Sequence, residues 1–454
     1  MSSERNQNEE NFIKMTEKPV GKLISGLAVP TIISMLITSI YNMADTFFVS
    51  KLGTSASGAV GVVFSLMSII QAVGFTLGMG CGSNISRLLG QKKYKKANEI
   101  ASSGFFASIF FGSLLLITGT IFSDELISLL GANKTIFPYA KSYGQYILFG
   151  APIMAASFVL NNTLRAQGKA KFAMIGITSG GILNMLLDPL FIFTFKLGIA
   201  GAAIATILSQ FISFCILIWF YIGKKSNVEL SIKHISKTAD TYLLIIKTGL
   251  PSFCRQGLAS IATVMLNRSA IIYGDAAVAA MSIVGKVFMM IFSVSLGFGQ
   301  GYQPVVGFNY GAKKMERVKK SFLFTLKVGE ICMATFAVIG FFSAEYIIRF
   351  FIDNDPKVIE IGSRALRAQC ISMLFIPLGV VCNMTFQTIG KSWTATFLSS
   401  TRQGLFFLPL IYFLPKIIGI TGVEIAQSCA DILTFLVSLP FAINFFKQLN
   451  KGLS

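Results

Sequence analysis

The chain has 454 residues, of which 53% are hydrophobic and only 13% are charged, and its formal net charge is +19. Soluble domains carry about a quarter charged residues, so this composition excludes an ordinary soluble protein. The positive charge lies in short loops between long apolar runs, and this distribution argues against a nucleic-acid partner.

Residues 1–22 are polar and lack the apolar stretch and cleavage site of a signal peptide, so we expect a cytoplasmic amino-terminal tail. Apolar runs of roughly 20 residues, the length of a transmembrane helix, then alternate with short polar breaks. Twelve spans are predicted, at about 23–48, 58–80, 98–121, 140–161, 171–195, 198–221, 243–269, 277–302, 320–343, 363–388, 394–414 and 420–445. The sequence thus predicts an all-α integral membrane protein with twelve transmembrane helices.

Lys and Arg are more frequent in the tails and loops on the side of the amino terminus than in the opposite loops. This positive-inside pattern predicts a multi-pass protein of the cell membrane with both termini in the cytoplasm. Basic loops such as "SRLLGQKKYKKANE" and "NYGAKKMERVKK" are therefore interpreted as topology signals and contacts with lipid headgroups.

The two halves of the chain align when the sequence is shifted by 221 residues, so that Pro30 meets Pro251 and Gly53 meets Gly274. Each half holds six spans, and such parallel repeats are related by an axis along the membrane normal. Two six-helix lobes facing each other suit alternating access. The predicted divisions are a tail at 1–22, an N-lobe at 23–221, a cytoplasmic linker at 222–242, a C-lobe at 243–445 and a second tail at 446–454.

Two acids lie well inside spans of the first half, where a charge is costly and faces the bundle interior or a water-filled cavity. Asp45 precedes Lys51 by six residues, about 9 Å along a helix, and Asp188 precedes Lys196 by eight, about 12 Å. Thr206 lies about 12 Å into the next span. Spans one, five and six thus present polar oxygens at nearly one depth.

Asn184 and Asp188 are four residues apart and share one helix face. Pro189 removes a backbone amide and frees a carbonyl near Asp188. These hard oxygens suit Na⁺, or a proton on a buried carboxylate. The alternative is that Asp188 only caps or hydrogen-bonds a neighbouring helix.

The second half does not repeat this set, because Asp45 aligns with Leu266 and Asp188 with Pro409. It carries cations at depth instead: Arg255, Arg268, Lys286 and Arg402. We expect Arg402 to pair with Asp431 and Glu424, and consider that Arg255 faces a central cavity.

Aromatic and Met side chains, which stack on flat cations and adapt to apolar ligands, are candidates for a substrate cavity: Tyr41, Tyr143, Phe158, Met281, Met289 and Met290. Packing against lipid is the alternative for most of the 42 Phe residues. Pro30, fifteen residues before Asp45, is either a hinge of the first span or a fixed kink. Pro189 is a second candidate hinge.

The seven cysteines are scattered and the one histidine, His234, lies in a polar loop, so we expect neither a transition-metal site nor a cofactor. The chain has no catalytic His and no GxxxxGK[ST] loop, which argues against a membrane enzyme. A receptor or channel would not explain acids confined to one lobe.

Four segments together resemble the multidrug and toxic compound extrusion (MATE) family, in its DinF/MepA-like branch: "YNMADTFFVSKLG", "LRAQGKAKFAM", "NMLLDPLFIF" and "GFGQGYQPVVGFNYGAKK". The resemblance covers nearly the whole chain and implies a cation-driven antiporter that exports organic cations and other amphiphiles. It implies a cation site at Asp45, Asn184, Asp188 and Thr206, with Tyr41, Tyr143 and Asn161 as polar neighbours. Other branches keep acids in the seventh and tenth spans, where this chain has Arg255, Gln256, Cys382 and Asn383.

The leading hypothesis is a monomeric antiporter in which Na⁺ or H⁺ drives the export of amphiphilic drugs across the bilayer. The alternative is a flippase for a lipid-linked precursor, which requires a cationic, solvated cavity across both lobes. The acids of the first lobe argue against the flippase.

Overall fold

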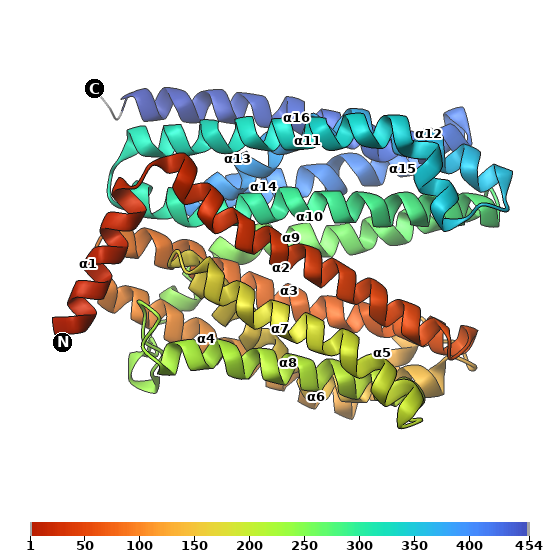
Figure 1. Ribbon diagram of the computed structural model, residues 1–454, viewed down its shortest axis with the longest axis horizontal. Helices are drawn as coiled ribbons and strands as arrows, with labels where there is room; N and C mark the ends of the chain where they lie inside the picture. The colour runs from red at the N-terminus through yellow and green to blue at the C-terminus, as the bar shows by residue number, and fades with distance from the viewer. Residues whose placement is uncertain (1, 452–454) are drawn as a thin grey trace.

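The computed structural model describes residues 2–451, which form helices and no strand (Figure 1). The first half contains α1 (Ser2–Glu17), α2 (Val20–Ser50), α3 (Thr54–Gly90), α4 (Tyr94–Ile121), α5 (Ser123–Leu129), α6 (Phe137–Ala166), α7 (Ala170–Pro189), η1 (Leu190–Thr194) and α8 (Gly198–Ile222). The second half contains η2 (Ile232–His234), α9 (Ala239–Ile271), α10 (Asp275–Gly311), α11 (Met315–Phe351), α12 (Pro356–Met373), α13 (Ile376–Ile389), α14 (Ser392–Ser400), η3 (Thr401–Phe407), α15 (Leu408–Ile418) and α16 (Ile420–Lys451). The predicted all-helical class is confirmed.

Nine helices between residues 2 and 451 are long and apolar enough to cross a membrane, and the bent pair α12–α13, with an angle of 53°, brings the number to ten. The other two predicted spans are also helical. Helix α9 carries Lys247, Arg255 and Arg268 along its length, which lowers its apolar character. The span at α14–η3–α15 is divided by a wide π-helical turn into short pieces.

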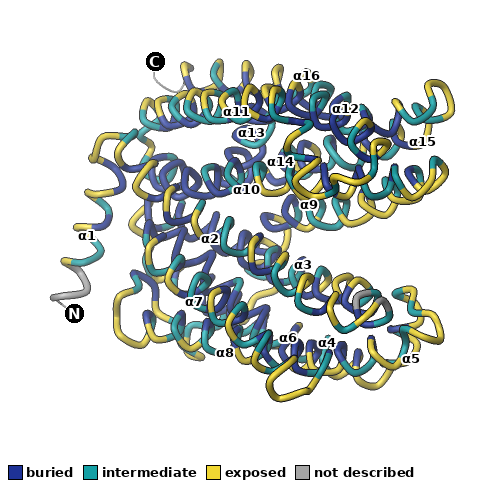
Figure 2. Tube along the Cα trace, turned by 45° about the vertical axis from the view of Figure 1, so that its right-hand side comes forward, coloured by how far each residue is buried: buried dark blue, intermediate teal, exposed yellow. Residues whose placement is uncertain are grey.

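Helices α2–α8 form the N-lobe and α9–α16 form the C-lobe, and both chain ends lie at the same end of the molecule, here called the terminal end (Figure 1). One hydrophobic core at the terminal end belongs to both lobes, because it joins Leu77 and Ile85 of α3 with Tyr302 and Val305 of α10. Toward the opposite, far end each lobe has a core of its own. The lobes accordingly meet at the terminal end and diverge toward the far end (Figure 2).

The internal repeat is visible in the backbone. Gly53 and Gly274, which precede α3 and α10, have φ of 116° and 95°. Lys92 and Lys313, which follow the same two helices, have φ of 58° and 60°. Positive φ is uncommon for a non-glycine residue, so its recurrence at the predicted offset shows that the two halves share local conformation as well as sequence.

The lobes touch through bare backbone at the terminal end. A Cβ placed on Gly90 of α3 would lie 2.2 Å from the carbonyl oxygen of Phe308, and one on Gly311 of α10 would lie 2.2 Å from that of Arg87. The two contacts are the same contact seen from each half, because both pairs are related by the 221-residue offset. Glycine is required at these positions because any side chain would separate the helices.

The predicted tail and linker are both ordered against the lobes. Helix α1 occupies most of residues 1–22 and lies across the terminal end (Figure 1). The linker after α8 docks on α4, where Ser231 N donates to Ser102 Oγ (3.1 Å) and Ser236 N to Ser103 Oγ (2.8 Å). Both segments therefore join the folded core of the terminal end.

Candidate cation site in the N-lobe

Two neighbouring spans of the N-lobe bring an amide, a carboxylate and a hydroxyl together. Asn184 and Asp188 lie one turn apart on α7, and Asn184 Nδ2 donates to Asp188 Oδ1 and to Thr206 Oγ1 of α8, both at 3.3 Å. All three side chains are buried, with Asp188 at 0% exposure. The stacking expected from the four-residue spacing on α7 is confirmed.

The other acid reaches the same group from α2. Asp45 follows Tyr41 by one turn, and Asp45 and Asp188 are near enough to repel each other. Tyr143 of α6, which is fully buried, lies beside Asp45 and Thr206. The structure therefore brings together, from four helices, the two acids and four of their expected polar partners: Tyr41, Tyr143, Asn184 and Thr206.

Four buried oxygens of this group have no hydrogen-bond partner among the described residues: Asp45 Oδ1, Asp188 Oδ2, Asn184 Oδ1 and Tyr143 Oη. Buried polar atoms are nearly always paired, so a cluster of unpaired acceptors is uncommon. Carboxylate, amide and phenol oxygens are hard ligands, and their chemistry fits Na⁺ or a proton shared by the carboxylates. A cap on a neighbouring helix, the alternative for Asp188, would leave no such acceptors.

Pro189 shapes the backbone beside this cluster. Helix α7 ends at Pro189 and continues as the π-helical turn η1, Leu190–Thr194. Proline supplies no amide hydrogen, and single π-helical turns occur frequently at functional sites. The start of α8 packs closely here, since a Cβ on Gly201 would lie 2.7 Å from the backbone of Phe191.

Asn161 does not belong to this cluster, and its predicted place as a polar neighbour is wrong. Its Nδ2 donates to Ala173 O (2.9 Å), near the terminal ends of α6 and α7. The repeat explains this bond, because Asn383 Nδ2 donates to Ala395 O (2.7 Å) in the C-lobe, and both residues lie 222 positions after their N-lobe counterparts. Asn161 thus joins α6 to α7, as Asn383 joins α13 to α14, rather than lining the site.

The remaining predicted residues are dispersed. Met281 is buried in the C-lobe core, whereas Met289 is 57% exposed. Arg255 lies between α9 and α13, where its Nη1 donates to Asn383 Oδ1 at 3.5 Å. Pro30 is buried within α2, in the half of that helix nearer the terminal end.

The acids of the last span do not share one partner. Asp431 pairs with Arg402 (2.7 Å), as predicted, but Glu424 pairs with Arg364 (2.8 Å), which the sequence prediction missed. Arg364 comes from α12, which is packed against α16. The other two cations expected at depth, Arg268 and Lys286, are exposed.

Arg165 is a buried cation that the sequence analysis did not single out. It lies at the end of α6, is 5% exposed, and donates to Asn162 Oδ1 and, across the lobes, to Gln300 Oε1. A cavity of about 20 Å³ beside it is lined by Met79, Gly82, Ser83, Ser86, Asn162, Ala166, Gln300, Gln303 and Pro304. The signal was the arginine in "LRAQGK", which resembles an ordinary cation at the end of a span.

A larger apolar cavity of about 270 Å³ lies between α2, α10, α11 and α13. Its wall includes Ile32 of α2, Phe298 of α10 and Met333 of α11. The cavity adjoins the segment of α2 that contains Pro30, so a bend of α2 at this proline would change its shape.

Comparison with known proteins agrees with the repeat and the lobes. The MatE family model matches residues 30–190 and 251–413, so its two matches begin 221 residues apart. The multidrug export protein MepA of Staphylococcus haemolyticus (strain JCSC1435) is 26% identical over 438 residues, covering 94% of this chain and 96% of that protein. MepA of Staphylococcus aureus (strain NCTC 8325 / PS 47) is 26% identical over 435 residues, covering 95% of each chain.

Solved structures show the same fold. A crystal structure of MATE in complex with MaL6 matches with a TM-score of 0.92 and 26% identity, over 97% of this chain and 99% of that chain. An outward-facing conformation of a multidrug resistance MATE family transporter matches with a TM-score of 0.91 and 26% identity, over 97% and 98%. A MOP superfamily transporter from Pyrococcus furiosus, described as having a binding pocket of reverse polarity, has a TM-score of 0.90 and 26% identity, over 98% and 99%. With both halves matched by the family model and the two-lobe fold shared throughout, this chain is a transporter of the MatE family.

Proposed function

We propose that the chain exports amphiphilic organic cations and is driven by Na⁺ or H⁺ entering through the N-lobe. The observation that carries the proposal is the set of unpaired buried oxygens around Asp45 and Asp188. Two carboxylates close to each other repel when both are ionised, so a bound cation or proton stabilises the pair. The relatives in Staphylococcus are named multidrug export proteins, which supports drugs as the exported compounds.

In this mechanism the driving ion and the drug bind to the protein in turn. Divergence of the lobes at the far end gives a driving ion access to the acids, and its binding removes the repulsion between them. Helix α2, which carries Asp45, then changes its packing at Pro30 and alters the apolar cavity beside it. Coupling requires only that ion and drug stabilise different arrangements of α2.

Reconstituted protein tests the proposal through Asp188→Asn. Export of a fluorescent organic cation is measured with a sodium gradient alone and then with a proton gradient alone. We expect wild-type export with at least one gradient and loss of gradient-driven export in the variant. The control is Glu345→Gln, which removes an exposed acid paired with Arg349 on α11. Unchanged export by Asp188→Asn would overturn the coupling mechanism.

A second function, movement of an anionic lipid-linked precursor, is favoured by one observation. Arg165 and Arg255 are close enough to repel each other, and no carboxylate among residues 2–451 forms an ion pair with either. A buried and a half-buried cation, neither of them paired with a carboxylate, favour an anionic ligand. A lipid-flipping assay run beside dye export separates the two functions, because only the flippase would move a pyrophosphate-linked lipid.

We further propose that the terminal end faces the cytoplasm and that the chain works as a monomer in the cell membrane. The lysine-rich turns after α3 and α10, around Lys92 and Lys313, both lie at this end and support the orientation.

A further inference from the structure

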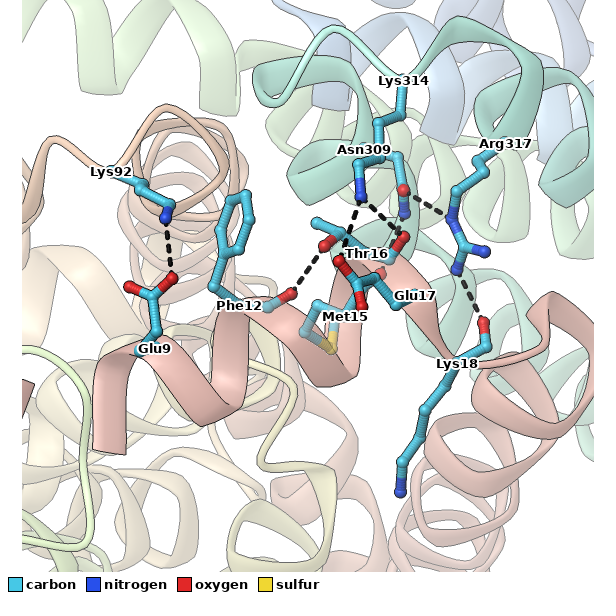
Figure 3. Close-up of polar contacts among 10 residues, drawn as sticks. All are labelled: Glu9, Phe12, Met15, Thr16, Glu17, Lys18, Lys92, Asn309, Lys314 and Arg317. Carbon is cyan, nitrogen blue, oxygen red and sulfur yellow. Dashed lines mark hydrogen bonds and ion pairs between the residues drawn. The ribbon is translucent and has the colours of Figure 1, made fainter. Parts of the chain in front are cut away.

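Helix α1 rests on the N-lobe through its side chains (Figure 3). Asn11, which is buried, donates from Nδ2 to Gln167 O of the α6–α7 turn at 3.0 Å. Nζ of Lys92, which follows α3, lies 2.9 Å from Glu9 Oε1 and 4.4 Å from the ring centre of Phe12. These contacts fix α1 against two different turns of the N-lobe.

Met15 is the apolar anchor of this docking. Its side chain is fully buried and covers Gly168, where a Cβ would lie 2.6 Å from Met15 Sδ. Gly168 also has a φ of 77°, a conformation that favours glycine. Met15 can therefore pack on the α6–α7 turn only because residue 168 is a glycine.

The C-lobe binds the other side of α1 through its backbone. Three donors of the C-lobe reach carbonyl oxygens at the end of α1: Asn309 Nδ2 to Met15 O (3.1 Å), Lys314 Nζ to Thr16 O (3.2 Å) and Arg317 Nη2 to Lys18 O (2.7 Å). Figure 3 shows these side chains converging on the last turn of α1 from α10, α11 and the turn between them.

These bonds cap a helix from a different lobe. The last carbonyls of a helix have no partner within it, and the helix dipole makes this end negative. Cationic side chains satisfy both needs. The C-cap of α1 is therefore supplied by the C-lobe, which also pairs Lys314 with the side chain of Glu17 (3.8 Å), while the side chains of Glu9, Asn11 and Met15 contact the N-lobe.

We propose that α1 is a strap that holds the two lobes together at the terminal end and must release when they part there. The rest of the interface between the lobes at this end, here called the seam, combines glycine contacts with backbone, as at Gly90 and Gly311, with side-chain bonds such as that from Arg87 Nη1 to Ile389 O (3.0 Å). The strap adds charged hydrogen bonds across it. The strap role of α1 goes beyond the proposed export function. It rests on that function only because it requires the lobes to separate at this end.

Hydrogen–deuterium exchange of the full chain in lipid nanodiscs tests the strap with Arg317→Met. Peptides covering α1, residues 84–92 and residues 305–313 report on the strap and on both sides of the seam. We expect at least about tenfold faster exchange in all three, because the variant loses the bond from Arg317 Nη2 to Lys18 O and also the bond from Arg317 Nε to Asn309 Oδ1 (2.9 Å). The control is Lys319→Met, because among the described residues Lys319 donates to Asn450 Oδ1 (3.0 Å), within the C-lobe, and not across the seam.

Asn11→Ala repeats the test from the N-lobe side, where it removes the bond to Gln167 O. The strap predicts that this variant also loosens the seam. Faster exchange confined to α1, or no change in any of the three peptides, would show that α1 is only a docked tail. Exchange is measured without substrate or gradient, so a failure of the export hypothesis would leave this result intact.

Discussion

Arg402 Nε lies 2.7 Å from Asp431 Oδ1 inside the C-lobe, with side-chain exposures of 16% and 0%. The shift of 221 residues aligns Arg402 with Gly181, which packs against Tyr41 in the N-lobe. A guanidinium thus extends into the C-lobe where the N-lobe has only a glycine beside its acid cluster. The C-lobe carries a cation of its own, which agrees with a coupling site in the N-lobe alone.

This pair predicts a large loss of stability when one partner is removed. In Arg402→Met the carboxylate of Asp431 stays buried without its cation, and we expect the free energy of unfolding to fall by about 3 kcal/mol. Thermal unfolding in detergent, followed by tryptophan fluorescence, measures the loss. The double variant Arg402→Met/Asp431→Leu removes both charges and should unfold nearer the wild-type temperature; a double variant as unstable as the single one contradicts this account.

Tyr143 predicts an effect on the affinity for the driving ion. Its hydroxyl is buried beside Asp45 and forms no hydrogen bond of normal geometry with the described residues, so Tyr143→Phe removes a candidate ligand and little volume. We expect about a tenfold increase in the ion concentration for half-maximal export, as for a lost bond to a charged group. Tyr139→Phe, on the same helix at 45% exposure, is the matched control. Equal ion dependence in both variants would remove Tyr143 from the site.

The close contact of α9 with α3 at Gly249 predicts that a side chain at this position is not tolerated. A Cβ at Gly249 of α9 would lie 1.9 Å from Thr76 O of α3, whereas Gly257, on the same helix, has open space. Gly249→Ala should therefore keep the terminal end from closing, increase hydrogen exchange on both sides of the seam and lower export at least tenfold. Gly257→Ala should leave both unchanged. Normal export by Gly249→Ala would show that closure does not require this contact.

Lys169 predicts a dependence of stability on pH. Burial, and next the nearby Lys14, lower the pKa of Lys169 from 10.5 to about 8. Between these values the unfolded chain binds more protons than the folded one, so this group makes stability rise with pH from about 8 to 10.5 and has no effect below that window. The midpoint temperature of thermal unfolding, measured from pH 7 to 10, should rise less with pH in Lys169→Met than in the wild type. Parallel curves would exclude the effect.

Much of the candidate site is predictable from sequence, for a geometric reason. Helical rise converts the spacing of Asp45, Asp188 and Thr206 from the ends of their spans into one depth, and the structure places them together. The repeat also predicts the two lobes, because positions such as Gly53 and Gly274 constrain the backbone. Cation binding at the cluster itself stays a proposal.

Other features depend on contacts between distant segments. Asn161 is polar and lies within a span, but only the pairing of α6 with α7 shows that its amide bonds Ala173 O. Arg165 is buried, and its bond to Gln300 requires the C-lobe to lie against the N-lobe. Helix α1 has few apolar residues, and its docking requires the turn at Gly168 and the cap from Arg317. None of these contacts leaves a periodic pattern in the sequence.

The paired contacts of Gly90 with Phe308 and of Gly311 with Arg87 bear on how often the molecule can cycle. Where an α-carbon rests on a carbonyl oxygen, the attraction consists of weak Cα–H···O interactions and dispersion. Such smooth faces can part without rotating a side chain and can meet again in the same register. These contacts can therefore break and re-form many times. Because they occur as a pair related by the repeat, together they define one relative position of the two helices.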